Sequence, residues 1–546
     1  MKKFSYLERE ELLSQVEEKQ YDLIVIGGGI TGCGIALDAI SRGISTLLIE
    51  MQDFASGTSS RSTKLVHGGL RYLKQFDIST VSEVGKEREV VYKNAKHVTT
   101  PEWMLLPIYK GGTFGKYSTS IGLRVYDFIA GVKKHERRKM FNQNETLLKE
   151  PLLKNEGLLG GGYYVEYRTD DARLTLEIAK KAHELGADLL TYCKVNNFKI
   201  ENNTINGVVV QDLLTNQHVE VKGTKVVNAA GPWVESVIAL DEPIKGKNLL
   251  HTKGVHVVYD QKRFPLKQAV YFDTEDGRMV FAIPRGGKTY VGTTDTIYQG
   301  DLVNPTITKE DIDYVVSATQ FMFPKLKLTA NDVESAWSGI RPLINQEGKK
   351  PSEISRKDEI WKSTNGLYTI AGGKLTGYRK MAQNVLDKIQ SELESINGNI
   401  YVACQTKDLR LSGGDFDTIT ELSERAKTIP IFEKLRIDDR DIDMLVQQYG
   451  SNIESLKLVA EEMNSSEGIS IPVQLMVDYG IDYEMVIRPT DFFIRRTGSL
   501  LFNRDWLEKW KEPVIDYMAD KLNWSTLDKV KYKEELESRI SEIDVR

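Results

Sequence analysis

The chain has 546 residues, of which 40% are hydrophobic and 28% are charged, as is typical of a globular protein with two or three domains. Its formal net charge of −5 argues against a general nucleic-acid-binding protein, and no nucleic acid is expected among its partners. No apolar run approaches the ~18 residues of a transmembrane helix, and the charged start MKKFSYLEREELLSQ does not resemble a signal peptide, so we expect a cytoplasmic protein.

The first predicted elements lie in residues 21–50, YDLIVIGGGITGCGIALDAISRGISTLLIE. A short apolar run predicts a buried strand, residues 30–42 predict a helix, and residues 45–49 predict a second strand. Between the first strand and the helix the sequence has G-x-G-x-x-G spacing, formed by Gly27, Gly29 and Gly32. Glu50 ends the second strand, close to the ~20-residue spacing expected for an acid that binds a ribose hydroxyl.

This order of elements has a physical reason. The first glycine permits a tight turn, the second lets the backbone approach a pyrophosphate, and the third allows the helix to pack closely on the strand. The start of the helix, which includes Thr31, favours the negative charge of a phosphate. The segment therefore predicts a dinucleotide-binding site.

Two later turns favour FAD over NAD. TKVVNAAGPW, residues 224–233, is an apolar strand that ends in small residues, and NGLYTIAGGKLTGYRKMAQNVLDKI, residues 365–389, is a strand, a glycine pair and a helix. Three backbone turns that converge on one extended cofactor are typical of FAD domains of the glutathione-reductase type. The predicted cofactor contacts here are Ala230, Gly231 and Gly373.

The rest of the chain predicts an α/β protein with further domains. Residues 171–186 predict a helix, residues 187–230 a β meander, and residues 250–296 a second β region with a hairpin at PRGGK. After about residue 400 the sequence changes to short, charged, amphipathic helices. We expect a FAD-dependent oxidoreductase region, 1–400, with Rossmann-type FAD-binding segments at about 20–95, 170–235 and 335–395. Substrate or cap β segments then occupy about 96–169 and 236–334, and a helical carboxyl-terminal domain occupies 401–546.

The cysteines do not suggest a metal site. Cys33, Cys193 and Cys404 are far apart and form no CxxC pair, so neither a disulfide framework nor a zinc site is expected. Buried, inert thiols are the simpler interpretation, and a covalent flavin anchor stays open.

Several stretches resemble the FAD-dependent glycerol-3-phosphate dehydrogenases. They are SGTSSRSTKLVHGGLRYL (56–73), YRTDDARLT (167–175), VNAAGPW, KGVHVV, VGTTD, SGIRPL (338–343) and AGGKLTGYRKMA. The resemblance covers essentially the whole chain. It implies oxidation of sn-glycerol 3-phosphate to dihydroxyacetone phosphate in glycerol catabolism, with transfer of the electrons through FAD to a membrane quinone.

The resemblance also implies roles for particular residues. His256 and Arg341 match residues at the reacting hydroxyl, and the matches to substrate-holding residues are Arg71, Tyr72, Arg356, Lys374 and Thr376. Cofactor contacts in the first loop are expected from Ser59, Ser60, His67, Gly68 and Gly69. Arg61 stands where the family often has a smaller residue, which leaves its role open between cofactor phosphate, substrate and solvent.

The chemistry agrees with these roles. A phosphate dianion calls for several cationic donors, and arginine offers a bidentate geometry that lysine lacks. Oxidation of an alcohol requires a group that accepts the hydroxyl proton, and a neutral histidine is suited to that step. His256 is the preferred base, with His67 or a water molecule perturbed by an arginine as alternatives.

Membrane attachment and the identity of the electron acceptor are less directly indicated by the sequence. Residues 118–139 combine an apolar helical stripe with a basic end, which suits either a core-packed helix or an anionic membrane surface. Peripheral attachment to the inner face of the cell membrane follows from the resemblance, and a homodimer is left as an open alternative.

The competing activity is a glycerol-3-phosphate oxidase that reduces oxygen to peroxide. The absence of a long insertion before the last flavin turn favours the dehydrogenase. A relative that oxidises amines is a more distant alternative.

Overall fold

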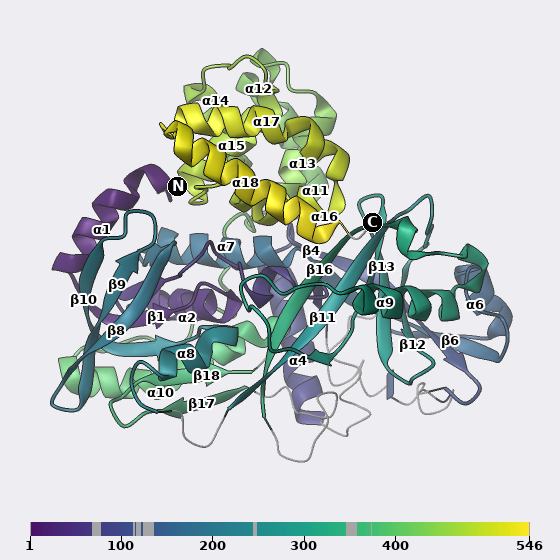
Figure 1. Ribbon diagram of the computed structural model, residues 1–546, viewed down its shortest axis with the longest axis horizontal. Coiled ribbons are helices and arrows are strands. Elements are labelled where there is room, and N and C mark those ends of the chain that lie inside the picture. The colour runs from purple at the N-terminus through teal and green to yellow at the C-terminus, as the bar shows by residue number, and fades with distance from the viewer. Residues whose placement is uncertain are drawn as a thin grey trace.

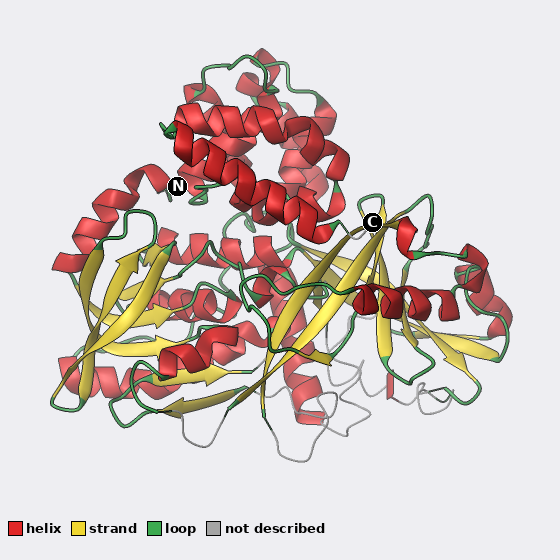
Figure 2. Ribbon diagram, in the orientation of Figure 1, coloured by secondary structure: helices red, strands yellow, loops and turns green. Residues whose placement is uncertain are grey.

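The computed structural model describes residues 2–67, 78–112, 115, 122–123, 136–243, 248–345, 358–372 and 374–544, with only the backbone for 78–81. Two β-sheets lie side by side, and a helical carboxyl-terminal domain covers both at the top of Figure 1. The expected α/β class, with a Rossmann-type sheet, a second sheet and a helical domain, is confirmed. Figure 2 shows strands together with helices in the two lower parts and only helices and loops in the upper one.

The first sheet has a parallel centre. Its main path runs through β17 (Glu359–Lys362), β18 (Tyr368–Ala371), β10 (His218–Asn228), β1 (Gln20–Ile26), β2 (Thr46–Ile49) and β7 (Asp188–Leu190). Strands β8 (Cys193–Glu201) and β9 (Thr204–Asp212) extend from β10 in antiparallel pairs, as the meander predicted. Helices pack on this sheet: α1 (Arg9–Glu18), α2 (Ile30–Ser41), α7 (Asp171–Glu184), α8 (Val234–Ile238) and α10 (Tyr378–Asn397). Because both faces are covered, the central strands are continuous apolar runs.

The parallel pairing brings the predicted turns to one edge. Strands β1, β2, β10 and β18 all run in the same direction, with Ile26 opposite both Ile49 and Asn228. Their carboxyl ends therefore lie together, and ligands of such sheets bind beyond that edge.

The second sheet is mostly antiparallel. Its main path runs through β15 (Thr296–Ile297), β11 (Leu249–Asp260), β14 (Lys288–Gly292), β13 (Met279–Arg285), β12 (Ala269–Asp273), β4 (Thr99–Tyr109), β6 (Leu158–Thr169) and β3 (Leu65–Val66). Strand β16 (Val333–Ile344) pairs with β11, and β5 (Lys139–Phe141) pairs with β6. The PRGGK hairpin is confirmed, since Gly286 and Gly287 turn between β13 and β14 with positive φ. Most of β16 falls within 335–395, the segment that we assigned to the cofactor, and it contributes to this second sheet instead.

The two faces of this sheet have different neighbours. Along β11, Val255, Val257 and Tyr259 belong to a core shared with α9 (Lys309–Met322). Side chains alternate in a strand, so His256 lies on the opposite face. The helices α4 (Ile78–Asn94) and α6 (Gln143–Lys149) complete this half of the molecule.

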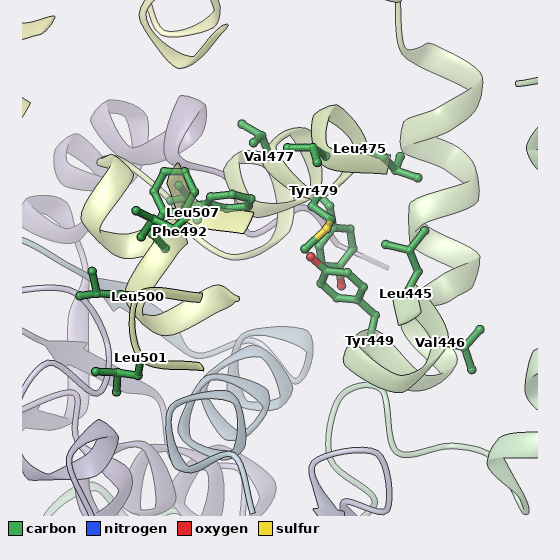
Figure 3. Close-up of a cluster of buried hydrophobic side chains, with 14 of the residues drawn as sticks. Leu445, Val446, Tyr449, Leu475, Val477, Tyr479, Phe492, Leu500, Leu501 and Leu507 are labelled. Atoms are coloured by element: carbon green, nitrogen blue, oxygen red, sulfur yellow. The ribbon is translucent and has the colours of Figure 1, made fainter. Parts of the chain in front are cut away.

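The helical domain has its own core. It contains α11 (Ile419–Lys427), α12 (Pro430–Lys434), α13 (Asp439–Tyr449), α14 (Ile453–Glu462), α15 (Ile471–Tyr483), a π-helical segment Asp491–Arg496, α16 (Ser499–Phe502), α17 (Arg504–Lys521) and α18 (Thr526–Ile543). Leucine, valine and aromatic side chains from these helices fill its centre (Figure 3). The domain also contacts the second sheet, where Ser335 Oγ donates a hydrogen bond to Leu501 O at 2.8 Å.

The segment 118–139, with its candidate membrane stripe, lies mostly outside the described residues. In the described part of the chain, no helix is both long and apolar enough to cross a bilayer.

Candidate cofactor and substrate site

The glycine-rich turn after β1 is shaped by close backbone contacts. Gly27 adopts φ +112°, and a Cβ at this position would lie 2.6 Å from Ala229 O. A Cβ at Gly32 would lie 1.8 Å from Gly27 O, so only glycine lets α2 start this close to β1. Gly29 is the N-cap residue directly before α2, and Thr31 lies in the first turn of the helix. The turn thus aims the amino end of a buried helix at the edge of the sheet, where a phosphate binds favourably.

Glu50 and Ser59 surround this turn. The Glu50 carboxylate accepts hydrogen bonds from Gly28 N at 2.6 Å and Gln52 N at 2.7 Å, and burial raises its pKa. Each carboxylate oxygen can accept two hydrogen bonds, so each Glu50 oxygen can accept one more, from a ribose hydroxyl. Ser59 Oγ accepts from Ile30 N at 2.9 Å, at the start of α2.

The other two predicted turns meet the first one. Ala229 N donates to Ile26 O at 2.8 Å, which holds the turn Ala230–Gly231 beside Gly27. The third turn begins at Lys374, and the Thr376 hydroxyl accepts from His67 N at 3.1 Å and donates to His67 O at 3.2 Å. Three segments that are far apart in the sequence therefore lie at one edge of the first sheet, as an extended cofactor requires. These residues fit a bound FAD.

Residues 56–66, here called the flavin loop, pass from this cofactor site onto the second sheet. The Thr58 hydroxyl donates to Ile340 O at 2.6 Å, and Trp337 Nε1 donates to Ser62 O at 3.1 Å. Gly339 lies between those two partners on β16, and a Cβ there would lie 2.3 Å from Arg61 O. The glycine of SGIRPL thus lets the flavin loop backbone lie directly on the strand.

His256 lies on this same face of the sheet. It is directly opposite Trp337 in the β11–β16 pair, and the two rings stack with centroids 4.6 Å apart. Its Nε2 is 3.0 Å from Thr63 Oγ1, and its Nδ1 is a buried atom with no hydrogen-bond partner in the described residues. The side chain is 1% exposed. Burial, together with the cations of Arg341 and Lys64, holds the pKa of His256 well below its usual value.

Arg341 lies on the same face of β16, four residues after Trp337. Its Nη2 donates to Thr293 Oγ1 at 3.0 Å, and its Nη1 lies 3.2 Å from Thr294 O and 3.3 Å from Asp295 Oδ1. A Cβ at Gly254 would lie 2.3 Å from Arg341 Nη2, so this second glycine gives the guanidinium its space. Residues 293–295, from the VGTTD stretch, therefore hold the guanidinium of Arg341 in place.

Sequence reasoning missed an ion pair that fixes the flavin loop. Lys64 Nζ donates to Asp171 Oδ1 at 2.7 Å and to Ser60 O at 2.8 Å, and Ser62 Oγ donates to Asp171 Oδ2 at 2.7 Å. Both charged side chains are buried. The signal was present in two stretches, STKLVHGG and YRTDDARLT, but nothing local shows that they meet.

Arg61 lies between the second sheet and the helical domain. Its Nη1 donates to Val303 O at 2.9 Å. Burial and the nearby cations of Arg495 and Arg539, both in the helical domain, lower its pKa to about 10. Its side chain therefore lies at the junction of the second sheet and the helical domain.

Some predicted residues cannot be placed. Gly68, Gly69, Arg71, Tyr72, Arg356 and Gly373 lie outside the described residues. Of the other predicted positions, Ser60 is buried in the flavin loop, while His67 and Lys374 are half-buried. No cluster of metal-ligating side chains occurs within the described ranges.

Comparison with known proteins agrees with this geometry. Residues 22–378 match the family model described as FAD dependent oxidoreductase, and residues 404–529 match the model described as C-terminal domain of alpha-glycerophosphate oxidase. The chain is 55% identical to an aerobic glycerol-3-phosphate dehydrogenase of Bacillus subtilis (strain 168), over 98% of this chain and 97% of that protein. It is 54% identical to one of Staphylococcus aureus (strain USA300), with the same coverage.

A solved structure is also similar over nearly its full length. The crystal structure of the glycerol-3-phosphate dehydrogenase from Bacillus halodurans complexed with FAD has a TM-score of 0.84 and 46% identity, and it covers 99% of this chain and 98% of its own. FAD is therefore the cofactor of this chain, and the three turns are the candidate site for it.

Proposed function

This chain belongs to the family of FAD-dependent glycerol-3-phosphate dehydrogenases, and we propose that it oxidises sn-glycerol 3-phosphate to dihydroxyacetone phosphate and passes the electrons to a membrane quinone. The single observation that carries this proposal is the shared sheet face on which His256 and Arg341 lie next to the flavin loop. A base and a cation beside a flavin suit the oxidation of an anionic alcohol.

The reaction removes a hydride from the secondary carbon and a proton from its hydroxyl group, which leaves a carbonyl. When bound, FAD accepts the hydride. The protein must then hold the substrate, accept the proton and exclude water, and these tasks belong to its own side chains.

His256 is suited to the proton transfer because it is neutral. Burial, and after it the cations of Arg341 and Lys64, lower the pKa of His256 and so keep the ring unprotonated at pH 7, and a neutral imidazole accepts a proton at one nitrogen. If Nε2 donates to Thr63, then the buried Nδ1 is the remaining acceptor. Trp337 fixes the plane of the ring by stacking.

Arg341 is suited to hold negative charge. Its guanidinium is held by the backbone and side chains of 293–295, which pre-organises its donors before substrate arrives. In a half-buried site, a charge-assisted contact from this group to a phosphate or developing oxyanion is stronger than in water. Lys374 and Thr376, and the motif residues Arg71, Tyr72 and Arg356, are proposed to hold the rest of the substrate.

Substitution of the base tests this assignment. Because the pKa of His256 lies well below its usual value, we expect kcat/KM to stay flat through neutral pH and to fall only in acid well below the ordinary histidine range, as His256 becomes protonated. His256→Gln should remove the acid limb and lower the rate by about 100-fold or more, with His67→Gln as the matched variant. An acid limb that survives in His256→Gln and disappears in His67→Gln would transfer the role of base to His67.

Substitution of the cation tests substrate binding. Arg341→Ala should nearly abolish flavin reduction by sn-glycerol 3-phosphate. Arg263→Ala, which removes a half-exposed arginine paired with Asp332 elsewhere in the same β region, should leave it unchanged. Equal rates in the two variants would remove Arg341 from the site.

The acceptor requires its own experiment. The match of residues 404–529 to a domain described for alpha-glycerophosphate oxidase makes oxygen the second candidate. The purified yellow protein is mixed anaerobically with sn-glycerol 3-phosphate, and either air or a soluble quinone is then admitted. Fast reoxidation by quinone with slow reoxidation by air supports the dehydrogenase, whereas immediate reoxidation by air with peroxide supports the oxidase. No bleaching at all would reject the substrate.

We propose further that the protein binds reversibly to the inner face of the cell membrane, where quinone is found. The basic run Arg137–Lys139 at the end of 118–139 supports this attachment, because cationic side chains are attracted to anionic lipid surfaces. Co-sedimentation with vesicles that contain phosphatidylglycerol should decrease when 137–139 are replaced by glutamine. Equal sedimentation of the two proteins would reject this surface.

A further inference from the structure

The loop that follows β2 closes over the glycine-rich turn. Ala55 N donates to Gly28 O at 3.0 Å, and Gly28 N donates to the Glu50 carboxylate. Phe54 packs on the same glycine, since a Cβ at Gly28 would lie 3.1 Å from Phe54 Cδ1. Residues 50–55, here called the clasp, therefore hold Gly28 from both its donor and its acceptor side.

The clasp adopts a conformation that it does not favour by itself. Ala55 has φ +61°, in the left-handed region that disfavours every residue with a Cβ. Such a conformation persists only where surrounding contacts hold it. Ala55 itself is held by its hydrogen bond to Gly28 O, and the neighbouring Asp53 is held by a different domain.

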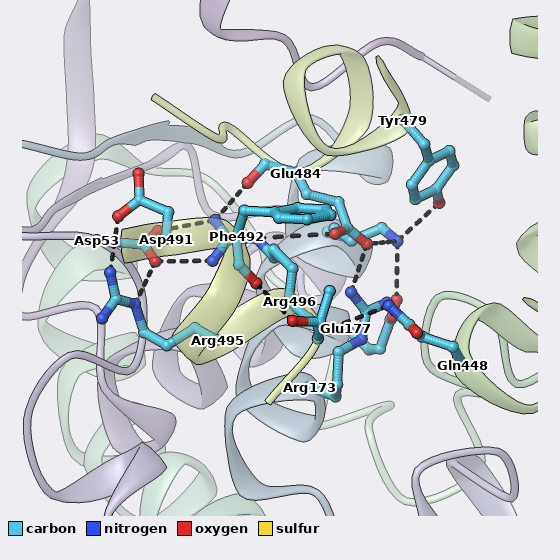
Figure 4. A network of polar contacts seen from close by, with 12 residues as sticks. Asp53, Arg173, Glu177, Gln448, Tyr479, Glu484, Asp491, Phe492, Arg495 and Arg496 are labelled. Carbon is cyan, nitrogen blue, oxygen red and sulfur yellow. Dashed lines mark hydrogen bonds and ion pairs between the residues drawn. The ribbon is translucent and has the colours of Figure 1, made fainter. Parts of the chain in front are cut away.

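Asp53, at the centre of the clasp, is held by two arginines of the helical domain. Arg496 donates to its carboxylate from Nη1 at 2.7 Å and from Nη2 at 2.8 Å, and Arg495 donates from Nε (Figure 4). The Asp53 side chain is fully buried. Although burial alone would raise its pKa, the two guanidinium groups lower it, so Asp53 is charged.

The two arginines are themselves fixed. Arg495 Nη2 donates to Asp491 Oδ1 at 2.7 Å, and Arg496 Nη2 donates to Glu484 O at 2.6 Å. A second tie joins the same parts, because Tyr192 N donates to Gln52 O at 2.9 Å while its hydroxyl donates to Asp491 Oδ1 at 2.6 Å. The helical domain thus has rigid donors aimed at the clasp.

We propose that Asp53, Arg495 and Arg496 are positioning residues for the cofactor, through which the helical domain holds the clasp around Gly28 and Glu50 and so slows the release of FAD. The helical domain then does more than cover the two sheets. It determines how tightly the nucleotide end of the cofactor is retained. This inference goes beyond the proposed reaction, since it holds whichever acceptor reoxidises the flavin.

The test measures FAD release from the holoenzyme, followed by the fluorescence of free FAD after dilution. Asp53→Asn should release FAD at least about tenfold faster than the unaltered protein, because it weakens a charge-assisted contact and removes one of the carboxylates that neutralise the two buried guanidinium groups. Arg495→Lys keeps the charge but loses the fork geometry, and it should accelerate release by a smaller factor. It also serves as the milder variant if Asp53→Asn folds poorly.

A matched control separates cofactor retention from general destabilisation. Glu177 is likewise fully buried in the same interdomain network, where Arg173 and Lys180 pair with it, and it does not contact the clasp. Glu177→Gln should lower the thermal midpoint about as much as Asp53→Asn but release FAD within about twofold of the normal rate. Equal acceleration in both variants, or normal release from Asp53→Asn, would overturn the proposal.

Discussion

Replacement of Gly339 by alanine should separate the flavin loop from the second sheet. The new Cβ would lie 2.3 Å from Arg61 O and 3.1 Å from Arg61 C, whereas ordinary contacts begin at 3.4 Å. Both atoms belong to the backbone, so no side-chain rotation relieves the clash. The loop must move by about 1 Å, and a misplacement of this size costs about 100-fold in rate when it affects reacting groups.

The affected group is His256, because Thr63 of the flavin loop is its hydrogen-bond partner. The rate of flavin reduction by sn-glycerol 3-phosphate, measured by anaerobic stopped-flow, should fall about 100-fold, which corresponds to ~2.7 kcal/mol. Overpacking should also lower stability by about 1–3 kcal/mol. The side chain of the neighbouring Ser338 lies on the opposite face of β16, where its hydroxyl donates to Pro305 O at 2.5 Å. As a control, Ser338→Ala should cost only about 1 kcal/mol of stability and leave the rate of flavin reduction within about threefold. A normal reduction rate in Gly339→Ala, with unchanged thermal midpoint, would show that the flavin loop does not need a glycine at this position.

Three further results are expected. Gly32→Ala should yield protein without bound FAD, visible as loss of the flavin absorbance, because its Cβ would lie 1.8 Å from Gly27 O; retention of the yellow colour would contradict this. Lys64→Met should move the acid limb of kcat/KM to higher pH, since the Lys64 cation is one cause of the low pKa of His256, and an unmoved limb would argue against His256 as base. The free energy of unfolding should fall as pH decreases below about 6.5. The reason is that burial lowers the pKa of His97 and His183, so the unfolded chain binds more protons than the folded one. Constant stability between pH 7 and 5 would exclude this linkage.

The local parts of the cofactor site were predictable from the sequence. The turn at Gly27 to Gly32 and its flanking strand and helix depend on contacts between residues close in the chain, so spacing and hydrophobic pattern are enough to locate them. The three turns that we predict to hold FAD were also located from the sequence, because each follows an apolar strand with small residues. Their convergence follows from parallel pairing, which a repeated strand-turn-helix pattern predicts.

The arrangement around His256 was not predictable in the same way. Its neighbours Trp337 and Arg341 are set by the register of β11 against β16, and a shift of one residue would move them to the other face. The Lys64–Asp171 pair joins positions 107 residues apart, and the Arg496–Asp53 pair joins positions 443 apart. Each charged residue on its own has the pattern of an ordinary surface side chain, and only the tertiary structure shows its partner.

The buried charges have a common consequence for this fold. Four cations, Arg173, Lys180, Arg495 and Arg496, pair with four carboxylates, Asp53, Glu177, Glu484 and Asp491, at the junction of the helical domain and the first sheet. Buried ion pairs add little net stability compared with apolar packing, but the loss of one partner is costly because it leaves an unpaired buried charge. We therefore expect the junction to favour one arrangement of the two domains, because any other would leave buried charges unpaired. If so, it also favours one position for the clasp and, through Gly28, one position for the turn that we propose holds the cofactor.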